Sequence, residues 1–397
     1  MKLKVLVVGA GLYVCGRGTA GFGTVLPALY ETYREGLLEK VYVAATNPNT
    51  IKELYGKVKE LNRVMGMALP VEGFPTERPE SYAYKRVLIE HEPHCAIVTV
   101  PDHLHFRITL EIMRKNVHAL VVKPLVPTLR EARLLIRYAR KHNVYGAVEF
   151  HKRYDEANLK LRNLILGKKL GDILSVDVNF SQRKSIPEKF FKDWALKTNI
   201  FQYLGVHYAD IIYFCTGASP LRVMATGQKK WLVKRGINTY DAIQVVVEWG
   251  NRITGEKFVS TILTNWIDPN TTSAMSDQRI AVVGTEGRYD SDQKNRGVQI
   301  VTDHDGIEDF NPYFSQFYTD GGGKIVFRGY GQRSIHQFLS DVADIVNGDK
   351  QPLDFYGVRP TFEEALVSTA IIEAAHRSLR KNNNWVTINR LRKVRRD

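Results

Sequence analysis

The first 150 residues alternate apolar, strand-like runs with segments of helical periodicity. The apolar runs cover residues 5–8, 41–45, 95–100, 117–122 and 144–150, and stretches with apolar residues at helical spacing lie between them. Repeated βα units with apolar strands form parallel sheets that carry helices on both faces. The alternation therefore predicts an α/β Rossmann fold, a doubly wound parallel sheet, over residues 1–150. In such sheets ligands bind at the carboxyl ends of the strands.

The rest of the chain has a different pattern. Long runs with alternating apolar residues lie at 173–181, 221–228, 243–249, 258–266 and 279–283, with few helical segments between them. Alternation of this kind is typical of an antiparallel sheet with one buried face. We expect residues 151–397 to form a second α/β domain with a mainly antiparallel, open sheet. Its final helices, at 334–347 and 361–379, could also pack back on the first domain.

The chain carries a formal charge of +14, with much of the excess dispersed along residues 129–141 and at the tail 390–396. Three explanations are open: a solvated surface, attraction of a phosphorylated or nucleotide-linked substrate, or contact with nucleic acid. No nucleic-acid-binding module accompanies the charge. We therefore expect a small-molecule substrate and no nucleic-acid partner.

Location and metal content follow from the termini and the cysteines. Met1 leads directly into a short apolar strand without an export signal, and no apolar run is long enough to span a membrane. Cys15, Cys95 and Cys215 are far apart and lack metal-ligand spacing. We predict a cytoplasmic protein with no metal and no membrane partner.

A glycine-rich segment follows the first strand. Gly9 and Gly11 match the first two positions of a dinucleotide fingerprint, but Val14 stands at the third. The next helical run begins after Gly23, so we infer an insertion at 12–20 with Gly23 as the third glycine. We expect Arg17, inside the insertion, to lie near the pyrophosphate or ribose phosphate of the dinucleotide.

The second strand decides between NAD and NADP in many dinucleotide-binding proteins, through a carboxylate at its end. Here Thr46 and Asn47 follow the strand, and neither is acidic. This favours NADP, but Asn47 could also hydrogen-bond a ribose hydroxyl, so NADP or NAD stays open. Val100, Pro101 and His105, after a later strand, are further cofactor-binding candidates, as is Lys123 at the sheet edge where the nicotinamide would lie. For His105, helix capping and packing are equally good explanations.

Two segments offer acid–base chemistry. Lys123 ends the run at 117–122 at the ligand-binding edge of the sheet, although a lysine after a buried strand is by default a surface group. Tyr203 and His207 lie within an expected helix at 201–214, one turn apart on the same face. A histidine in an apolar helix is often part of the core. With a neighbouring tyrosine, it is also a candidate base.

Six short motifs follow one another along the chain, at Val7–Gly11, Thr99–His105, Lys123-Pro124, Glu149–Tyr154, Gly205–Asp210 and Gly284–Gly287. In their order and spacing they resemble the motifs of the Gfo/Idh/MocA oxidoreductases. The resemblance covers nearly the whole chain. It implies an NAD(P)-dependent oxidoreductase that transfers a hydride between nicotinamide and a carbinol or carbonyl carbon of a sugar or nucleotide-sugar. It also implies a homodimer or homotetramer formed through the open face of the second sheet.

The resemblance assigns roles to individual residues. It implies that Lys123 contacts the reacting sugar oxygen and that His207 is the general base. Tyr203 stands where many members carry Asp, and Val122 where they carry Glu. Arg153 and Lys184 are candidates for binding the substrate, with Lys123, Tyr203 and His207. The change at Tyr203 leaves an alternative, a non-catalytic sensor that keeps the cofactor site.

Overall fold

The computed structural model describes residues 1–251, 255–389 and 391. The basic tail at 390–396 lies, apart from Leu391, outside the described residues. The chain forms two compact units. The first contains Met1–Leu125, Arg130–Tyr154 and Tyr313–Glu364, and the second contains Val126–Leu129, Asp155–Pro312 and Ala365–Asp397. A single division after residue 150 does not describe this path, because residues 313–364 return to the first unit.

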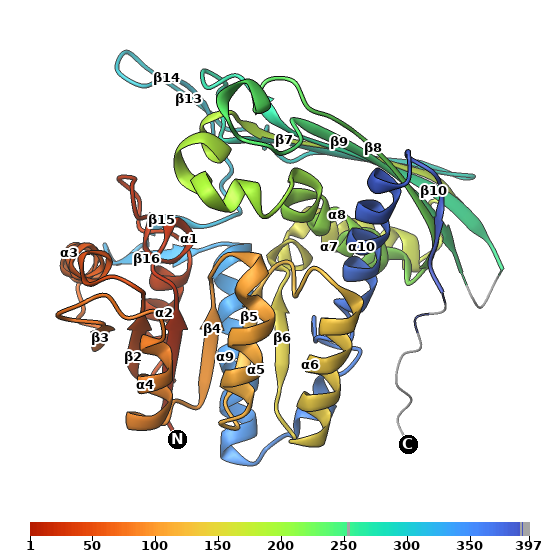
Figure 1. The fold of residues 1–397 in the computed structure, drawn as a ribbon. Coiled ribbons are helices and arrows are strands. Elements are labelled where there is room, and N and C mark those ends of the chain that lie inside the picture. Colours follow the sequence, from red (N-terminus) through yellow and green to blue (C-terminus); the bar gives the residue numbers. More distant parts are fainter. Residues whose placement is uncertain (252–254, 390, 392–397) are drawn as a thin grey trace. The chain divides into compact units, whose positions relative to one another are not determined.

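A six-stranded parallel sheet forms the centre of the first unit (Figure 1). Its strands are β1 (Leu3–Val8), β2 (Leu38–Ala44), β3 (Val71–Phe74), β4 (Cys95–Val98), β5 (His118–Val122) and β6 (Gly146–Glu149). Their spatial order is β3-β2-β1-β4-β5-β6, which is that of the doubly wound dinucleotide-binding fold. The predicted Rossmann sheet is confirmed. The order reverses between β1 and β4, so the loops after these strands flank the switch point.

Helices cover both faces of this sheet. They are α1 (Leu12–Cys15), α2 (Val25–Arg34), α3 (Pro48–Met65), α4 (Ala83–Glu90), α5 (His105–Met113), α6 (Leu129–Lys141) and α9 (Tyr330–Asn347). Figure 1 shows α5 and α6 in front of the sheet and α9 behind it. Ile335, Phe338 and Leu339 of α9 are buried in the same apolar core as α2 and β1. The late helix α9 thus completes the first unit's core.

The second unit is built on a mixed, mainly antiparallel seven-stranded sheet. Its strands are β7 (Ile173–Arg183), β8 (Ser219–Gln228), β9 (Ala242–Gly250), β10 (Lys257–Asp268), β11 (Ser276–Gly284), β12 (Arg288–Asp292) and β17 (Val386–Thr387). The order is β12-β11-β7-β10-β9-β8-β17, with β7 and β10 parallel. Along β7, Val176, Val178 and Phe180 are buried and alternate with exposed residues. This confirms the predicted open sheet with one buried face.

Helices α7 (Glu156–Leu166), α8 (Val206–Thr216) and α10 (Leu366–Arg380) lie along one side of this sheet (Figure 1). The prediction of one helix over 201–214 is wrong at its start, because residues Phe201–Gly205 form a π-helical turn before α8 begins. The predicted helix at 361–379 begins only at Leu366. β3 and α4 were not predicted, and in β3 the sequence Val71-Glu72-Gly73-Phe74 contains no apolar run that would indicate a buried strand. Among the described residues, no helix is long and apolar enough to cross a membrane.

Short helical turns and two hairpins connect or follow these elements. Short helical turns occur at η1 (Asp102–Leu104), η2 (His151–Tyr154), η3 (Ile186–Phe191), η4 (Lys192–Leu196), η6 (Val233–Arg235) and η7 (Pro352–Phe355). Two hairpins, β13–β14 (Gln299–Thr302, Gly306–Asp309) and β15–β16 (Gln316–Thr319, Ile325–Arg328), follow the second sheet in sequence.

Candidate functional site

The turn after β1 is built around Gly9. Its φ is +111°, and a Cβ there would lie 2.6 Å from Thr99 Oγ1. Thr99 itself donates from Oγ1 to the carbonyl oxygen of Val8 at 2.8 Å. Only glycine lets the loops after β1 and β4 approach this closely. The contact fixes the backbone at the switch point of the sheet.

Gly11 has a different role. A Cβ at Gly11 would meet no atom within 4 Å, so the space above its backbone is open. A fingerprint glycine that leaves room beside the backbone is what the close approach of a pyrophosphate requires. The residues of this turn therefore fit a dinucleotide.

Gly23 closes the inserted segment. Its φ is +70°, and a Cβ would lie 2.8 Å from both Cys15 N and the Leu12 carbonyl oxygen. α2 begins two residues later, at Val25. The insertion contains the short helix α1, which packs against this glycine. The requirement for glycine at position 23 is thus explained by packing within the insertion.

The inserted loop is fastened to α3. Arg17 Nε donates to Glu53 Oε2 at 2.7 Å, and both side chains are largely exposed. Lys57 Nζ donates to the carbonyl oxygens of Thr19 and Gly21, both at 2.9 Å. The structure therefore places Arg17 in an ion pair with Glu53. Its expected contact with a cofactor phosphate stays a prediction.

The end of β2 carries no carboxylate. Asn47 Oδ1 accepts a hydrogen bond from Asn49 N at 2.8 Å and caps α3, and the Thr46 carbonyl oxygen accepts from Glu80 N at 3.0 Å. Both side chains remain at least partly exposed. The side-chain oxygen of Asn47 accepts the capping hydrogen bond. Its side-chain NH2 group is therefore the part that could donate a hydrogen bond to a ribose or phosphate oxygen.

His105 braces two loops of the first unit. Its ring nitrogens lie 2.8 Å from the Val100 carbonyl oxygen and 2.7 Å from the Pro124 carbonyl oxygen. Burial lowers the pKa of His105 below its usual value. A neutral imidazole carries one N–H, so His105 donates to one of these carbonyl groups and packs against the other, between the loop after β4 and the turn after β5. This supports the packing explanation for His105, and Val100 and Pro101 lie on the half-buried loop that it holds.

Lys123 follows β5 directly, and the Lys123-Pro124 peptide bond is cis. Burial lowers the pKa of Lys123 to about 7, with Lys152 contributing in the same direction and Glu149 and Asp102 opposing it. A lysine whose pKa lies near 7 can gain or lose a proton at physiological pH. Lys123 is therefore chemically distinct from the exposed lysines of the chain.

Glu149 is a polar residue that the sequence did not single out as functional. It ends β6 and pairs in register with Val122 of β5. Its side chain is 2% exposed and accepts from Ser334 Oγ at 2.6 Å. His151 Nδ1 lies 3.0 Å from its other oxygen. In the sequence, the one signal for Glu149 is an acidic residue at the end of a buried strand. Its hydrogen-bond partner Ser334 lies 185 residues away, so their contact could not be predicted from local pattern.

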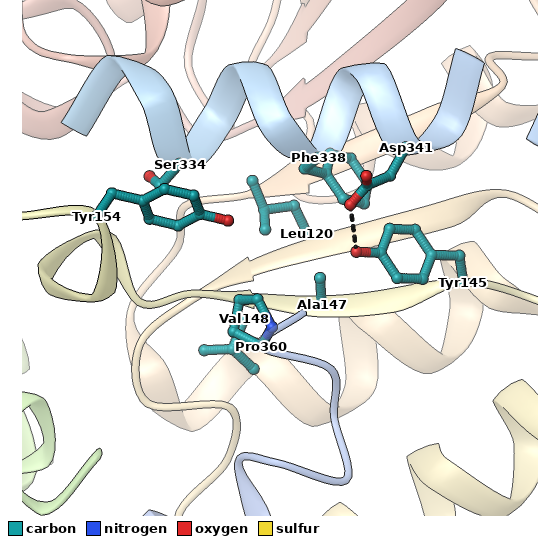
Figure 2. Close-up of a pocket in the computed structure, with 9 residues that line it drawn as sticks. All are labelled: Leu120, Tyr145, Ala147, Val148, Tyr154, Ser334, Phe338, Asp341 and Pro360. Atoms are coloured by element: carbon teal, nitrogen blue, oxygen red, sulfur yellow. Dashed lines mark hydrogen bonds between the residues drawn. The ribbon is translucent and has the colours of Figure 1, made fainter. Parts of the chain in front are cut away.

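A small internal cavity adjoins this network (Figure 2). Its volume of about 10 Å³ suits roughly one water molecule. Ser334 and Asp341 of α9 line it, with Tyr145 donating to Asp341 at 2.9 Å. Burial raises the pKa of Tyr154, another lining residue, to about 12, so this phenol stays protonated. The cavity is too small for a sugar or a nucleotide.

In the second unit, His207 lies in the first turn of α8 and is 4% exposed. Its ring centroid is 6.1 Å from that of Phe180 on β7. Tyr203, in the π-helical turn, is half-buried within a cluster of rings. The ring of Tyr203 lies 4.8 Å from Phe191 and 5.6 Å from Trp194, both edge-on. The π-helical turn joins these two candidates on consecutive turns of one continuous helical segment.

The two basic candidates have protein partners. Arg153 is 7% exposed, and its Nη1 lies 3.6 Å from Glu364 Oε2 within the first unit. Lys184, in the second unit, lies 5.0 Å from the ring centroid of Trp231, which also carries the Arg235 guanidinium at 3.6 Å. The charge of Arg153 is compensated by Glu364, whereas the half-buried Lys184 and the exposed Arg235 both lie over the indole ring of Trp231.

Among the described residues, no group of three or more His, Cys, Asp or Glu is arranged to hold a metal. Cys15, Cys95 and Cys215 are buried thiols that form no disulfide with one another.

Known proteins match both parts of the chain. Residues 3–150 match a family model described as the oxidoreductase family with an NAD-binding Rossmann fold, and residues 158–290 match the GFO/IDH/MocA C-terminal domain. Glucose-6-phosphate 3-dehydrogenase of Bacillus subtilis (strain 168) is 29% identical over 124 residues, covering 30% of this chain and 35% of that protein. The scyllo-inositol 2-dehydrogenase (NADP(+)) IolW of the same organism is 28% identical over 115 residues, covering 29% and 32%. These matches span about a third of the relatives' own length.

Solved structures resemble the whole chain. Scyllo-inositol dehydrogenase from Lactobacillus casei, with bound NAD(H) and scyllo-inositol, has a TM-score of 0.66 at 16% identity, covering 98% of this chain and 99% of that one. Myo-inositol 2-dehydrogenase from Lactobacillus plantarum has a TM-score of 0.68 at 16% identity, covering 98% and 100%. The fold is shared throughout. With both family models matched in order, the chain belongs to the Gfo/Idh/MocA family and contains its NAD(P)-binding Rossmann domain.

Proposed function

We propose that the protein is an NAD(P)-dependent dehydrogenase or reductase that transfers a hydride between nicotinamide and a carbinol or carbonyl carbon of a sugar, cyclic polyol or nucleotide-sugar. The observation that carries the proposal is Lys123, a lysine with a pKa lowered to about 7, at the carboxyl edge of a dinucleotide-binding sheet. The names of the relatives, which include dehydrogenases of glucose-6-phosphate and inositols, support a polyol-like substrate.

In the proposed reaction, different residues of the chain bind the cofactor, stabilise charge and transfer the proton. Gly9 shapes the turn and Gly11 leaves room for the pyrophosphate, while Asn47 offers its amide to the ribose side. When bound, the nicotinamide would accept the hydride from the substrate or donate it. Lys123, when protonated, stabilises negative charge that develops on the substrate oxygen. His207 takes or returns the hydroxyl proton, and Tyr203 can relay it.

The substrate's charge is a separate part of the proposal. Arg153 is compensated by Glu364, so Lys184 beside Trp231 is the remaining candidate for an anionic group. We propose that anionic sugars bind more tightly than matched neutral sugars, because charge-assisted hydrogen bonds are the stronger ones. Assays at two salt concentrations would show a salt-dependent substrate constant for anionic sugars. Equal specificity constants for both classes would reject this part.

Self-association is proposed through the open face of the second sheet. Val259 on β10 and Val283 on β11 are 41% and 42% exposed. A shallow hollow lined by Thr261, Leu263 and Arg279 lies on the same sheet. Exposed apolar residues rimmed by charge are typical of protein interfaces. Light scattering should show a homodimer or homotetramer, and Val259→Asp should dissociate it.

A cofactor-binding sensor without turnover is the second candidate. It is favoured by Tyr203, whose ring is held among Phe191 and Trp194 and which cannot supply a carboxylate. The test is an absorbance assay at the nicotinamide wavelength, with NAD and NADP in both directions, over a panel of inositols, hexoses, sugar phosphates and nucleotide-sugars. Turnover of any of them supports the enzyme. Cofactor and sugar binding in calorimetry without any turnover supports the sensor.

A further inference from the structure

The buried acid at the end of β6 has no part in the reaction as described so far. Glu149 lies in the strand next to Lys123, because its register partner on β5 is Val122, the residue before Lys123. β5 and β6 are adjacent parallel strands that end at the same edge of the sheet, so Glu149 at the end of β6 neighbours the turn after β5 that carries Lys123.

The carboxylate of Glu149 is held in place by two donors from different elements. Ser334 on α9 donates from Oγ at 2.6 Å. A carboxylate can only accept, so Nδ1 of His151, 3.0 Å away, must carry the hydrogen. Two donors stabilise the negative charge of a carboxylate that is almost fully removed from water.

Aromatic rings fix the orientation of His151. Its ring stacks on Tyr330, with centroids 5.7 Å apart and planes 17° from parallel, and Phe314 lies 5.3 Å away. Tyr13 of α1 approaches to 6.4 Å. Glu149 is therefore a preorganised anion and not a mobile side chain that happens to be near a lysine.

Lys123 is surrounded by charges of both signs. Glu149 from β6 and Asp102 from η1 favour its charged form, with Glu149 the stronger of the two, and Lys152 from η2 opposes it. His105 from α5 lies against the Pro124 carbonyl group and is kept neutral by burial. Burial disfavours the ammonium, so the anion on β6 is the main group that maintains it.

We propose that Glu149 is a positioning residue that keeps Lys123 in its charged, proton-donating form, with His151 and Ser334 holding the carboxylate in place. This inference rests on the role of Lys123 in the proposed function. An ammonium, and not a neutral amine, stabilises developing negative charge on a substrate oxygen. Glu149 acts through Lys123 and does not itself touch the reacting atoms.

The test is the titration of Lys123 in the full-length protein. Trace acetic anhydride labels only the neutral amine, and peptide mass spectrometry reports labelling of Lys123 from pH 5 to 10. The wild-type midpoint is expected near 7. In Glu149→Gln the midpoint should move down by about one pH unit or more, because an anion that favoured the ammonium is gone.

The direction of the shift separates this inference from simple structural damage. If Glu149→Gln merely loosened the site, water would reach Lys123 and its midpoint would rise toward the free-lysine value of about 10.4. Lys152→Met, which removes a neighbouring cation, should move the midpoint up while Glu149→Gln moves it down. Glu31→Gln is the matched control, since Glu31 is a buried carboxylate of the same unit bonded to Arg34 and Phe327 N. It should leave the midpoint unchanged.

Should Glu149→Gln not fold, Ser334→Ala removes one donor, keeps the acid, and should give a smaller downward shift. An unchanged or raised midpoint in the folded Glu149→Gln or Ser334→Ala protein overturns the inference. The result is independent of turnover: a downward shift in a protein that oxidises no sugar would leave Glu149 in this role and overturn the proposed function. If there is turnover, the high-pH limb of kcat/KM should shift with the labelling midpoint.

Discussion

The two units bring different chemistry to their candidate residues. In the first unit, charged and titratable groups meet at the ends of β5 and β6, where Lys123, Glu149 and Lys152 are buried or half-buried together. In the second, rings surround the candidates: Phe180 faces His207, and Tyr203 lies among edge-on aromatic side chains. The first region therefore has the electrostatic environment that changes a lysine's pKa, whereas the second surrounds its two candidates with apolar and aromatic side chains.

The origin of this difference is topological. A parallel sheet collects the carboxyl ends of all its strands at one edge, so polar residues from distant positions accumulate there. The inner face of the second sheet is an apolar surface covered by helices, so a polar side chain on α8 is surrounded by core residues. Under the proposed function, we therefore expect the first unit to act through electrostatics and the second through the placement of single side chains.

The largest expected effect is that of Lys123→Ala. Loss of a donor to developing oxyanion charge should lower kcat/KM by about a hundredfold or more. Cofactor affinity, measured by calorimetry, should stay within about twofold, since Lys123 is assigned to the substrate oxygen. Lys115→Ala, an exposed lysine of the same unit, is the control and should be fully active. Full activity in Lys123→Ala would remove the first region from the chemistry.

His207→Ala tests the second region in the same assay. Removing a general base should reduce kcat on the order of a hundredfold, with cofactor binding intact. The side chain is buried, so circular dichroism and a melting curve must show that the variant is folded. Wild-type turnover from a folded His207→Ala protein would point to Tyr203 as the proton-transfer group.

Gly11→Ala sharpens the assignment of cofactor binding to the first unit. The new methyl group meets no atom of the protein, so the melting temperature should hardly change. It would occupy the space left for the pyrophosphate, and cofactor affinity should fall on the order of tenfold. Gly56→Ala, at an exposed position of α3 where a Cβ would also meet no atom within 4 Å, is the matched control. Equal affinity in both variants would place the dinucleotide elsewhere.

The smallest effect is expected for Tyr203→Phe. The ring and its contacts with Phe191 and Trp194 are kept, and only the hydroxyl is lost. A relay that water can replace should cost less than about tenfold in kcat. Tyr203→Ala, which also removes the ring, should raise KM more than it lowers kcat. A loss in Tyr203→Phe as large as that in His207→Ala would make the tyrosine the principal acid–base group.

The sequence predicted those features that arise from local pattern. Apolar runs identified the strands of both sheets, and Lys123 was expected at the edge of the first sheet because a strand ends there. Features that depend on contacts between distant segments were not predictable. Ser334 meets Glu149 only because α9 returns to the first unit, and Arg17 meets Glu53 only through the path of the inserted loop.

The helix at 201–214 shows the limit of periodicity. Its apolar spacing is compatible with a continuous α-helix, but packing of Phe201 over Gly205 accompanies a π-helical turn before α8. A Cβ at Gly205 would lie 2.2 Å from the Phe201 ring, so this close packing requires glycine. Wide turns of this kind often occur at functional sites, but hydrophobic period alone does not reveal them.

Occupation of the sheet edge beside Lys123 by the nicotinamide is tested most directly by protection of this lysine. Acetic anhydride labelling at pH 8 is compared with and without saturating NADH or NADPH, with Lys115 as internal standard. The predicted result is a drop in Lys123 labelling by about tenfold, because a bound cofactor shields the half-buried amine, with Lys115 unaffected. Undiminished labelling of Lys123 in cofactor-saturated protein would contradict the placement of the reaction at the end of β5.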